Sequence, residues 1–153
     1  MRRAAVCAAV LAAGALGWAL WPPDPTPYEV YAAPAVRVDV RPASTAYADE
    51  AETAEELAPL VEAYVQRLAR GDAADLAELG DPRYRGQEAE ARKWIAAYGE
   101  PAAGGITAEV SSDVPYLAGI HLTFPDGTSQ QVSAFRTDGV WGLAMGEAVG
   151  EGY

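Results

Sequence analysis

Histidine chemistry has a single candidate in this 153-residue chain, because His121 is the only histidine. Any Ser-His-Asp triad or histidine-containing metal site would therefore have to include it. A triad would also need a carboxylate and an oxyanion hole nearby, and the alternation around His121 turns its imidazole away from the apolar side of a predicted strand. We interpret His121 as a surface residue of a sheet.

Carboxylates offer a second route to catalysis, because a base in an apolar interior can abstract a proton if a donor stabilises the oxyanion. The strand positions predicted to face the interior are apolar: Ile120, Leu122, Val132, Ala134, Leu143 and Met145. Asp113, Asp126 and Asp138 fall in turns or at strand ends. Glu109 stays open as a base if its strand has the opposite orientation. The sequence predicts a protein that is not an enzyme, with no catalytic residue and no cofactor.

Metal binding has weak support. Cys7 is the only cysteine, so neither an internal disulfide nor a cysteine cluster can form. An acidic cluster spans residues 49–56, but it lacks the glycine and the alternating spacing of a calcium loop. Thr53 and Glu56 instead have the spacing of a capping box at a helix start, although Pro59 complicates that start. The sequence predicts no metal site.

One combination of side chains is typical of a binding surface. The strand register derived below places Tyr116, Arg136 and Trp141 side by side on three strands. Tyrosine, tryptophan and arginine are enriched at binding hot spots, and an arginine beside aromatic rings can make cation–π contacts. We predict a binding site at these three residues. The alternative is that Arg136 only covers the end of the core with its aliphatic stem.

Three helices must precede the strands. Apolar residues recur with helical spacing from Leu57 to Leu68, and Gly71 ends this helix. Asp72 then caps a short second helix that stops at Gly80. A third helix is predicted for residues 87–98. Their apolar faces can all cover one side of a sheet.

Four strands follow, at residues 106–111, 116–124, 128–136 and 140–146. The turn around Gly127 sets residue 124 opposite 128, and the turn at Asp138-Gly139 sets 137 opposite 140. With these registers, the interior residues of three strands face each other. The predicted fold class is α+β, with N-terminal helices packed on a curved antiparallel sheet.

The N-terminal residues predict a location at a membrane. Arg2 and Arg3 precede an apolar run over residues 4–21 that ends with Trp18 and Trp21 near a double proline. At 1.5 Å per residue, the 18 residues span about 27 Å, close to the thickness of a hydrocarbon core. We predict a single-pass anchor in the cell membrane, with the C-terminal domain outside the cytoplasm. The alternative is a signal peptide removed near Ala33-Pro34-Ala35, which would give a secreted protein.

The predicted organisation has four parts. Residues 1–21 form the signal anchor, 22–52 a Pro/Ala-rich stalk, 53–147 the folded domain and 148–153 a C-terminal tail. Within the stalk, residues 36–40 alternate like a strand and could pair onto a sheet edge. The chain has 11 basic and 22 acidic residues, so nucleic acid is excluded as a partner.

The helical part also resembles a known family. The run from Leu60 to Leu79, with a long helix ending in Gly71-Asp72 before a short second helix, resembles the opening of NTF2-like (cystatin-like, SnoaL-type) domains. The segment Asp138-Gly139-Val140-Trp141 is similar to their final hairpin. This resemblance implies a cone in which a curved sheet wraps around the long helix. Some members are enzymes, whereas others are membrane-anchored envelope proteins without catalytic activity.

Taken with the anchor, the resemblance implies a membrane-tethered, extracytoplasmic module that has a protein partner in a bacterial cell-envelope complex, of the conjugation or secretion kind. The alternative is a secreted SnoaL-like small-molecule-binding protein or enzyme. The partner, the ligand and the oligomeric state do not follow from the sequence.

Overall fold

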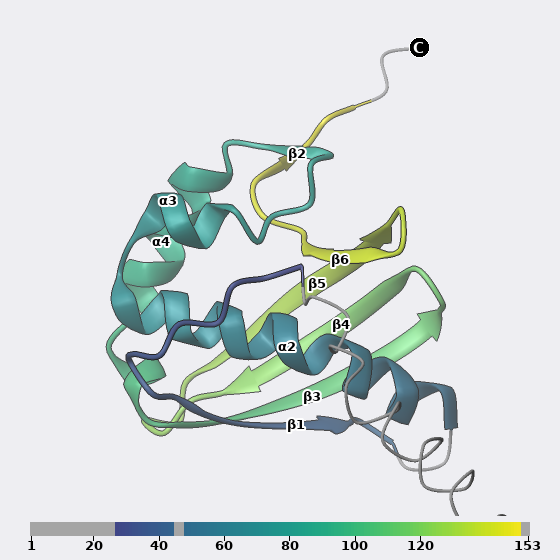
Figure 1. Ribbon diagram of the computed structural model, residues 1–153, viewed down its shortest axis with the longest axis horizontal. Coiled ribbons are helices and arrows are strands. Elements are labelled where there is room, and N and C mark those ends of the chain that lie inside the picture. Colours follow the sequence, from purple (N-terminus) through teal and green to yellow (C-terminus); the bar gives the residue numbers. More distant parts are fainter. Residues whose placement is uncertain (1–26, 45–47, 151–153) are drawn as a thin grey trace, which may run out of the picture.

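The computed structural model describes residues 27–44 and 48–150, which form an α+β domain (Figure 1). The helices are α2 (Ala48–Arg70), α3 (Ala73–Ala77), α4 (Gln87–Tyr98) and the 3-10 turn η1 (Pro101–Ala103). The strands are β1 (Arg37–Pro42), β2 (Tyr84–Arg85), β3 (Gly105–Val114), β4 (Leu117–Thr123), β5 (Ser129–Thr137), β6 (Val140–Leu143) and β7 (Glu147–Ala148). The predicted fold class is confirmed in its main feature, helices packed on a curved sheet.

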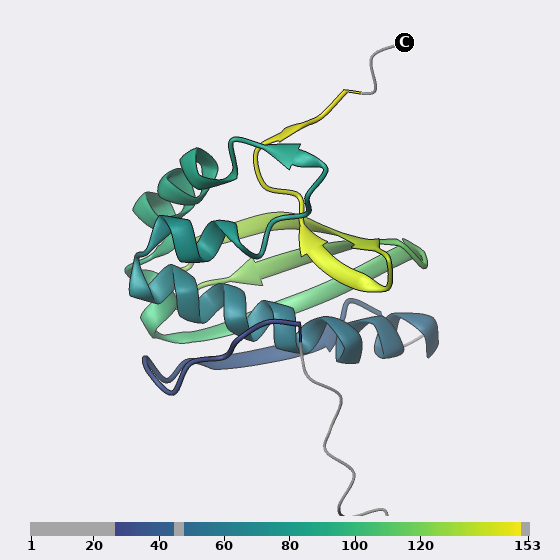
Figure 2. The same ribbon diagram turned by 45° about the horizontal axis from the view of Figure 1, so that its top comes forward.

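The main sheet has five strands in the order β1-β3-β4-β5-β6, and β2 and β7 form a separate ribbon. Strands β3 to β6 form an antiparallel meander, as predicted. Strand β1, however, runs parallel to β3 from Arg37 opposite Gly105 onward, so the sheet is mixed and not wholly antiparallel. The parallel pairing arises because α2, which follows β1 in the chain, runs back across the sheet before the chain enters the meander (Figures 1 and 2).

The predicted register of the meander is confirmed. Ile120 pairs with Val132, and Ala134 pairs with Leu143. Both turns use the left-handed conformations that set this register, with φ of 85° at Gly127 and of 52° and 82° at Asp138 and Gly139. Strand β6 ends at Leu143, earlier than predicted, but Met145 still points into the core and is fully buried.

Helix α2 begins earlier than the sequence predicted. Its first residue is Ala48, so Thr53 and Glu56 lie within the helix and do not form a capping box. The first turn is fixed instead by Glu50, whose carboxylate accepts a hydrogen bond of 3.0 Å from the backbone of Ser44. Pro59 lies inside the helix and cannot donate to the carbonyl four residues earlier. Burial of Leu57 and Leu60 on either side offsets that loss.

The core lies between α2 and the concave face of the sheet. Every interior position predicted on the strands is at most 3% exposed: Ile120, Leu122, Val132, Ala134, Leu143 and Met145. Two polar side chains, Tyr64 and Gln130, are buried with these residues. They satisfy each other, because the hydroxyl of Tyr64 donates a 2.6 Å hydrogen bond to the amide oxygen of Gln130. Burial raises the pKa of Tyr64, so the hydroxyl stays protonated and keeps donating. This arrangement, a long helix held in the hollow of a curved sheet, is the one implied by the resemblance to NTF2-like domains.

Residues 27–36, which we call the strap, run along α2 before the chain enters β1 (Figure 1). Part of the segment predicted as a stalk is therefore packed on the domain, and residues 48–52 belong to α2. The expectation that residues 36–40 pair onto a sheet edge is confirmed by β1. No helix in the described part of the chain is long and apolar enough to span a bilayer. The predicted anchor, with Arg2, Arg3, Trp18 and Trp21, lies outside the described residues.

Candidate functional site

The structure brings the three predicted binding residues together, with Tyr116 in the turn before β4, Arg136 on β5 and Trp141 on β6. The backbone N–H of Arg136 donates to the carbonyl of Tyr116 at 3.0 Å, and Arg136 pairs with Trp141 across β5 and β6. The guanidinium carbon lies 5.8 Å from the centre of the Trp141 ring, within the range of a cation–π contact. The spatial arrangement predicted from the sequence is therefore present, and its role in binding stays a prediction.

The three side chains differ in how much of them a partner could reach. Tyr116 is 60% exposed and the side chain of Arg136 is 38% exposed, whereas Trp141 is only 5% exposed. We call Tyr116, Arg136 and Trp141 the row. Trp141 is its buried member and supports the other two, and Tyr116 and Arg136 supply its exposed surface. The sequence could not separate these roles, because the register gives the neighbours of a residue but not the depth of cover above it.

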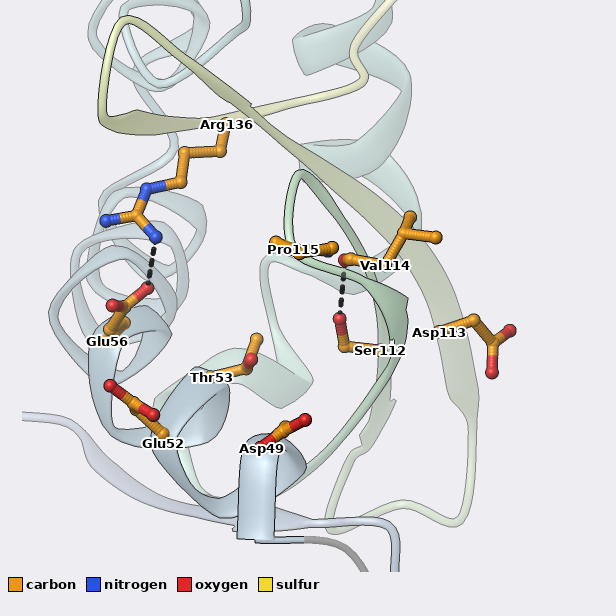
Figure 3. Close-up of a pocket in the computed structure, with 9 residues that line it drawn as sticks. All are labelled: Asp49, Glu52, Thr53, Glu56, Ser112, Asp113, Val114, Pro115 and Arg136. Carbon is orange, nitrogen blue, oxygen red and sulfur yellow. Dashed lines mark hydrogen bonds and ion pairs between the residues drawn. The ribbon is translucent and has the colours of Figure 1, made fainter.

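Glu56 on α2 is a fourth member that the sequence analysis assigned to a capping box. One of its carboxylate oxygens accepts from Trp141 Nε1 at 3.0 Å and lies 3.1 Å from a guanidinium nitrogen of Arg136. It orients both side chains and connects the row to α2, and Figure 3 shows its contact with Arg136. No sequence signal connects Glu56 with a strand 80 residues later, so only the fold reveals this contact.

An open pocket of about 320 Å³ lies beside the row, between the first turns of α2 and the end of the β3–β4 hairpin. Its lining is strongly acidic and consists of Asp49, Glu52, Thr53, Glu56, Ser112, Asp113, Val114, Pro115 and Arg136 (Figure 3). Arg136 is the one cation among these residues, and Glu56 holds it. Three of the acidic residues that the sequence placed at a helix start, Asp49, Glu52 and Glu56, thus form one wall of this pocket.

The other residues considered for catalysis lie on the outer face of the sheet. His121 is on the sheet surface, as predicted; it pairs with Gln131, and its Nδ1 lies 3.3 Å from the amide oxygen of that residue. Glu109 pairs with Arg41 through a 2.9 Å ion pair. Its strand orientation is therefore the one that directs the carboxylate away from the core. Within residues 27–44 and 48–150, no three His, Cys, Asp or Glu side chains are grouped to hold a metal ion.

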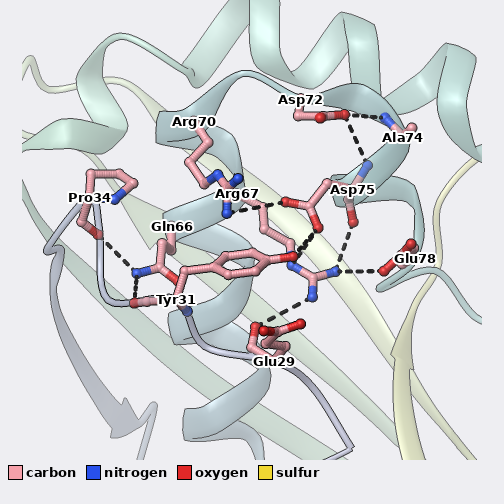
Figure 4. A network of polar contacts seen from close by, with 10 residues as sticks. All are labelled: Glu29, Tyr31, Pro34, Gln66, Arg67, Arg70, Asp72, Ala74, Asp75 and Glu78. Carbon is pink, nitrogen blue, oxygen red and sulfur yellow. Dashed lines mark hydrogen bonds and ion pairs between the residues drawn. The ribbon is translucent and has the colours of Figure 1, made fainter.

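A second polar cluster, which the sequence analysis missed, fixes the strap to α2 and α3 (Figure 4). The hydroxyl of Tyr31 donates to Asp75 at 2.7 Å, and the guanidinium of Arg70 lies 4.0 Å from the centre of the Tyr31 ring. Arg67 is 3% exposed, and its guanidinium donates to the carbonyl of Asp75 at 2.8 Å and to the carbonyl of Glu29 at 3.4 Å. These contacts join groups on three separate segments, so periodicity within one segment does not reveal them.

The side chain of Gln66 binds backbone groups of the strap. Its amide oxygen accepts from the N–H of Tyr31 at 2.7 Å, and its amide nitrogen donates to the carbonyls of Tyr31 and Pro34 at 2.6 and 2.9 Å. At the other end of the strap, the hydroxyl of Tyr28 donates to the carbonyl of Trp141. Burial raises the pKa of Tyr28 to about 12, which keeps that hydroxyl a donor at neutral pH. The strap therefore connects the polar cluster on α2 with the row.

Asp81 is a buried carboxylate that sequence reasoning treated only as part of a helix stop. It is 1% exposed and accepts hydrogen bonds from the backbone and side chain of Arg83 and from the hydroxyl of Thr137. Burial alone would raise the pKa of Asp81, but these hydrogen bonds outweigh it and hold the pKa below its usual range. The carboxylate is fully engaged by its neighbours and joins the α3–β2 loop to β5.

Side chains and elements together define this chain as an α+β domain with a filled, helix-lined curved sheet and a polar surface site at one end of the sheet. No protein-family model matches the sequence, and no curated protein matches it. Among solved structures, the chain is similar to a protein from Xanthomonas campestris described as a calcium/calmodulin dependent protein kinase II association domain. That likeness has 18% sequence identity and a TM-score of 0.35, and covers 60% of this chain and 82% of the other. At this level of likeness, function has to be inferred from the chain's own side chains.

Proposed function

We propose that this protein is an NTF2-like domain tethered to the outer face of a bacterial membrane, where it serves as a non-catalytic interaction module of a cell-envelope complex. The observation that carries the proposal is the contrast between a filled interior and a polar, partly exposed row at the sheet surface. The six interior strand residues named above are at most 3% exposed, whereas Tyr116 is 60% exposed.

The filled interior supports a role without catalysis. Proton abstraction in an apolar cone needs a carboxylate and an oxyanion donor that both reach the substrate. Among the buried side chains on the concave face of β4 to β6, the polar one is Gln130, and its amide oxygen accepts a hydrogen bond from Tyr64. Arg136, at the rim of the same face, is ion-paired with Glu56. Asp81 is buried at the edge of the sheet and is held by Arg83 and Thr137. The described interior thus supplies packing and leaves no acid–base pair facing a substrate.

The exposed row supports a protein partner. Tyrosine and arginine contribute strongly to protein interfaces because they combine a large contact area with hydrogen-bonding groups. The surrounding carboxylates and the net charge of −11 disfavour nucleic acid and anionic lipid surfaces. A protein that contacts Tyr116 and Arg136 is the partner that this surface fits best.

The strap supports retention of the N-terminal segment. Signal cleavage near Ala33-Pro34-Ala35 would remove Tyr28 and Tyr31 and leave Arg67 and Gln66 without the backbone groups that they bind.

The location can be tested by membrane fractionation of cells that express the full chain. We expect the protein to stay in the membrane pellet after an alkaline carbonate wash, because an inserted helix resists extraction whereas a peripheral protein does not. Release of full-length protein by the wash would exclude the anchor. A soluble product whose N-terminus lies near Val36 would favour the alternative, a secreted small-molecule-binding protein.

The interaction role can be tested with Arg136→Ala in a cross-linking experiment in intact cells. We expect this variant to lower the yield of cross-linked partner by about fivefold or more, since loss of a hot-spot arginine typically costs over 1 kcal/mol of binding. Arg136→Lys should give an intermediate yield, because lysine keeps the charge and loses the planar fork.

Arg41→Ala provides the matched control. Arg41 is also exposed and ion-paired, with Glu109, but it lies on the edge strand β1 away from the row. Its removal should leave the cross-linking yield unchanged. Equal yields for the wild type and Arg136→Ala would remove the row from the proposed function.

A further inference from the structure

The strap and the row share one groove. Pro27 and Tyr28 line a small groove of about 200 Å³ together with Glu56, Pro59, Arg136, Gly139, Val140 and Trp141. The first described residues of the chain therefore lie against the surface that we propose as the interaction site. A partner approaching Arg136 from this side would meet Tyr28.

Tyr28 also takes part in closing the outer edge of β6. At Leu143, the backbone N–H donates to the carbonyl of Leu79 and the carbonyl accepts from the N–H of Asp81, both at 2.8 Å. At Trp141, two residues earlier, the carbonyl accepts from the hydroxyl of Tyr28. One half of this edge is thus bound by backbone from the α3–β2 loop, and the other half by a side chain of the strap. A side-chain hydroxyl can leave without breaking a strand.

The contacts that hold the strap combine polar groups with a limited apolar surface. Tyr31, near its middle, is bound through Asp75, Gln66 and the ring contact with Arg70. Tyr28 and Val36, nearer its ends, are only partly buried against the core. The groups beneath Tyr31 are charged or amide side chains, which water can solvate when the strap lifts. Val30 is 41% exposed, so the middle of the strap buries little apolar surface. Opening the strap therefore costs less free energy than unfolding the sheet, whose contacts are apolar.

We propose that the strap is a detachable intramolecular cover of the groove that contains Arg136 and Trp141, so that the row is fully accessible only when the strap is released. This inference rests on the proposed function in one respect: a cover regulates binding only if the row binds a partner. The opening itself is a property of the chain and can be measured without a partner.

The test uses the full chain in detergent micelles and the double variant Tyr28→Phe/Tyr31→Phe. Both substitutions keep the aromatic rings and remove the hydroxyls that bind Trp141 and Asp75. The first measurement is hydrogen exchange at the amide of Tyr31, whose N–H is protected by Gln66. We expect exchange in the double variant to be about tenfold faster, with exchange in the middle of α2 unchanged.

The second measurement is the rate at which phenylglyoxal modifies individual arginines, followed by peptide mass spectrometry. We expect modification of Arg136 to be at least threefold faster in the double variant. Arg41 is the internal control, because it is exposed and paired with a glutamate but lies outside the groove, and its rate should not change. Unchanged hydrogen exchange in the middle of α2 shows that the variant keeps its fold.

Two results would overturn the cover. If the amide at position 31 exchanged as slowly as the core of α2 in both proteins, the strap would open only when the whole domain unfolds. If exchange became faster while modification of Arg136 did not, the strap would be detachable without covering the row. Failure of the proposed function looks different, since a row without a partner would give no cross-linked protein whatever the state of the strap.

Discussion

Replacing Ile120 with alanine is expected to lower the free energy of unfolding by about 2–5 kcal/mol. Ile120 is 2% exposed at the centre of the meander, where Val110 and Val132 flank it on the neighbouring strands. Its truncation would remove apolar contacts with both strands and leave a cavity that the surrounding backbone cannot fill. Chemical denaturation of the full chain, followed by far-UV circular dichroism, measures the change.

Ser133→Ala is the matched control for this substitution. Ser133 lies on β5, directly beside Val132, but it is exposed on the opposite face of the sheet. Its replacement should change the stability by less than about 0.5 kcal/mol. If the two variants were equally stable, Ile120 and Ser133 could not lie on opposite faces, and the register of the meander would be wrong.

The register of this sheet was predictable because local residues determine it. The turn at Asp138-Gly139 adopts two positive φ angles in succession, which favour Gly and Asp and fix a two-residue hairpin. Gly127 does the same for the longer turn between β4 and β5. Once the turns are fixed, alternation along each strand assigns every side chain to a face. This register also pairs Gln130 with the interior residue Leu122, so the burial of Gln130 was predictable from the sequence, although it was not predicted.

The first turns of α2 and the strap were not predictable in the same way. Proline is a strong local signal against helix, yet Pro59 lies within α2 because packing of the residues around it outweighs one lost hydrogen bond. The strap is held by Gln66 and Asp75, which lie 35 and 44 residues from Tyr31 in the sequence. Polar contacts over such separations leave no periodic pattern, so the strap resembled a stalk.

The candidate site also has a part that the sequence predicted and a part that only the fold reveals. The neighbours Arg136 and Trp141 follow from strand pairing, and the sequence therefore predicted them. Glu56 and Tyr28 come from other elements and are brought to the row by tertiary packing. The predicted row is thus one side of a groove whose other side only the fold supplies.

The buried carboxylate of Asp81 should contribute a second large effect. Asp81→Ala is expected to lower the free energy of unfolding by about 2–4 kcal/mol, because it removes the acceptor for both Arg83 and Thr137. The loop that carries Asp81 also supplies backbone partners to Leu143, so its loosening would expose the edge of β6. Thermal unfolding at neutral pH measures the loss. Asp39→Ala is the control, since Asp39 is an exposed aspartate on the edge strand β1.

The pH dependence separates the charge of Asp81 from its packing. Burial by itself would raise the pKa of Asp81, but the hydrogen bonds from Arg83 and Thr137 keep the folded-state pKa below the unfolded value of about 4. The stabilisation is therefore complete above about pH 5 and is lost as the pH falls through the folded-state pKa. Asp81→Asn keeps the shape and lacks this titration, so the stability gap between wild type and variant should narrow below about pH 4. A gap that stayed constant down to pH 2 would contradict a stabilising carboxylate at this position.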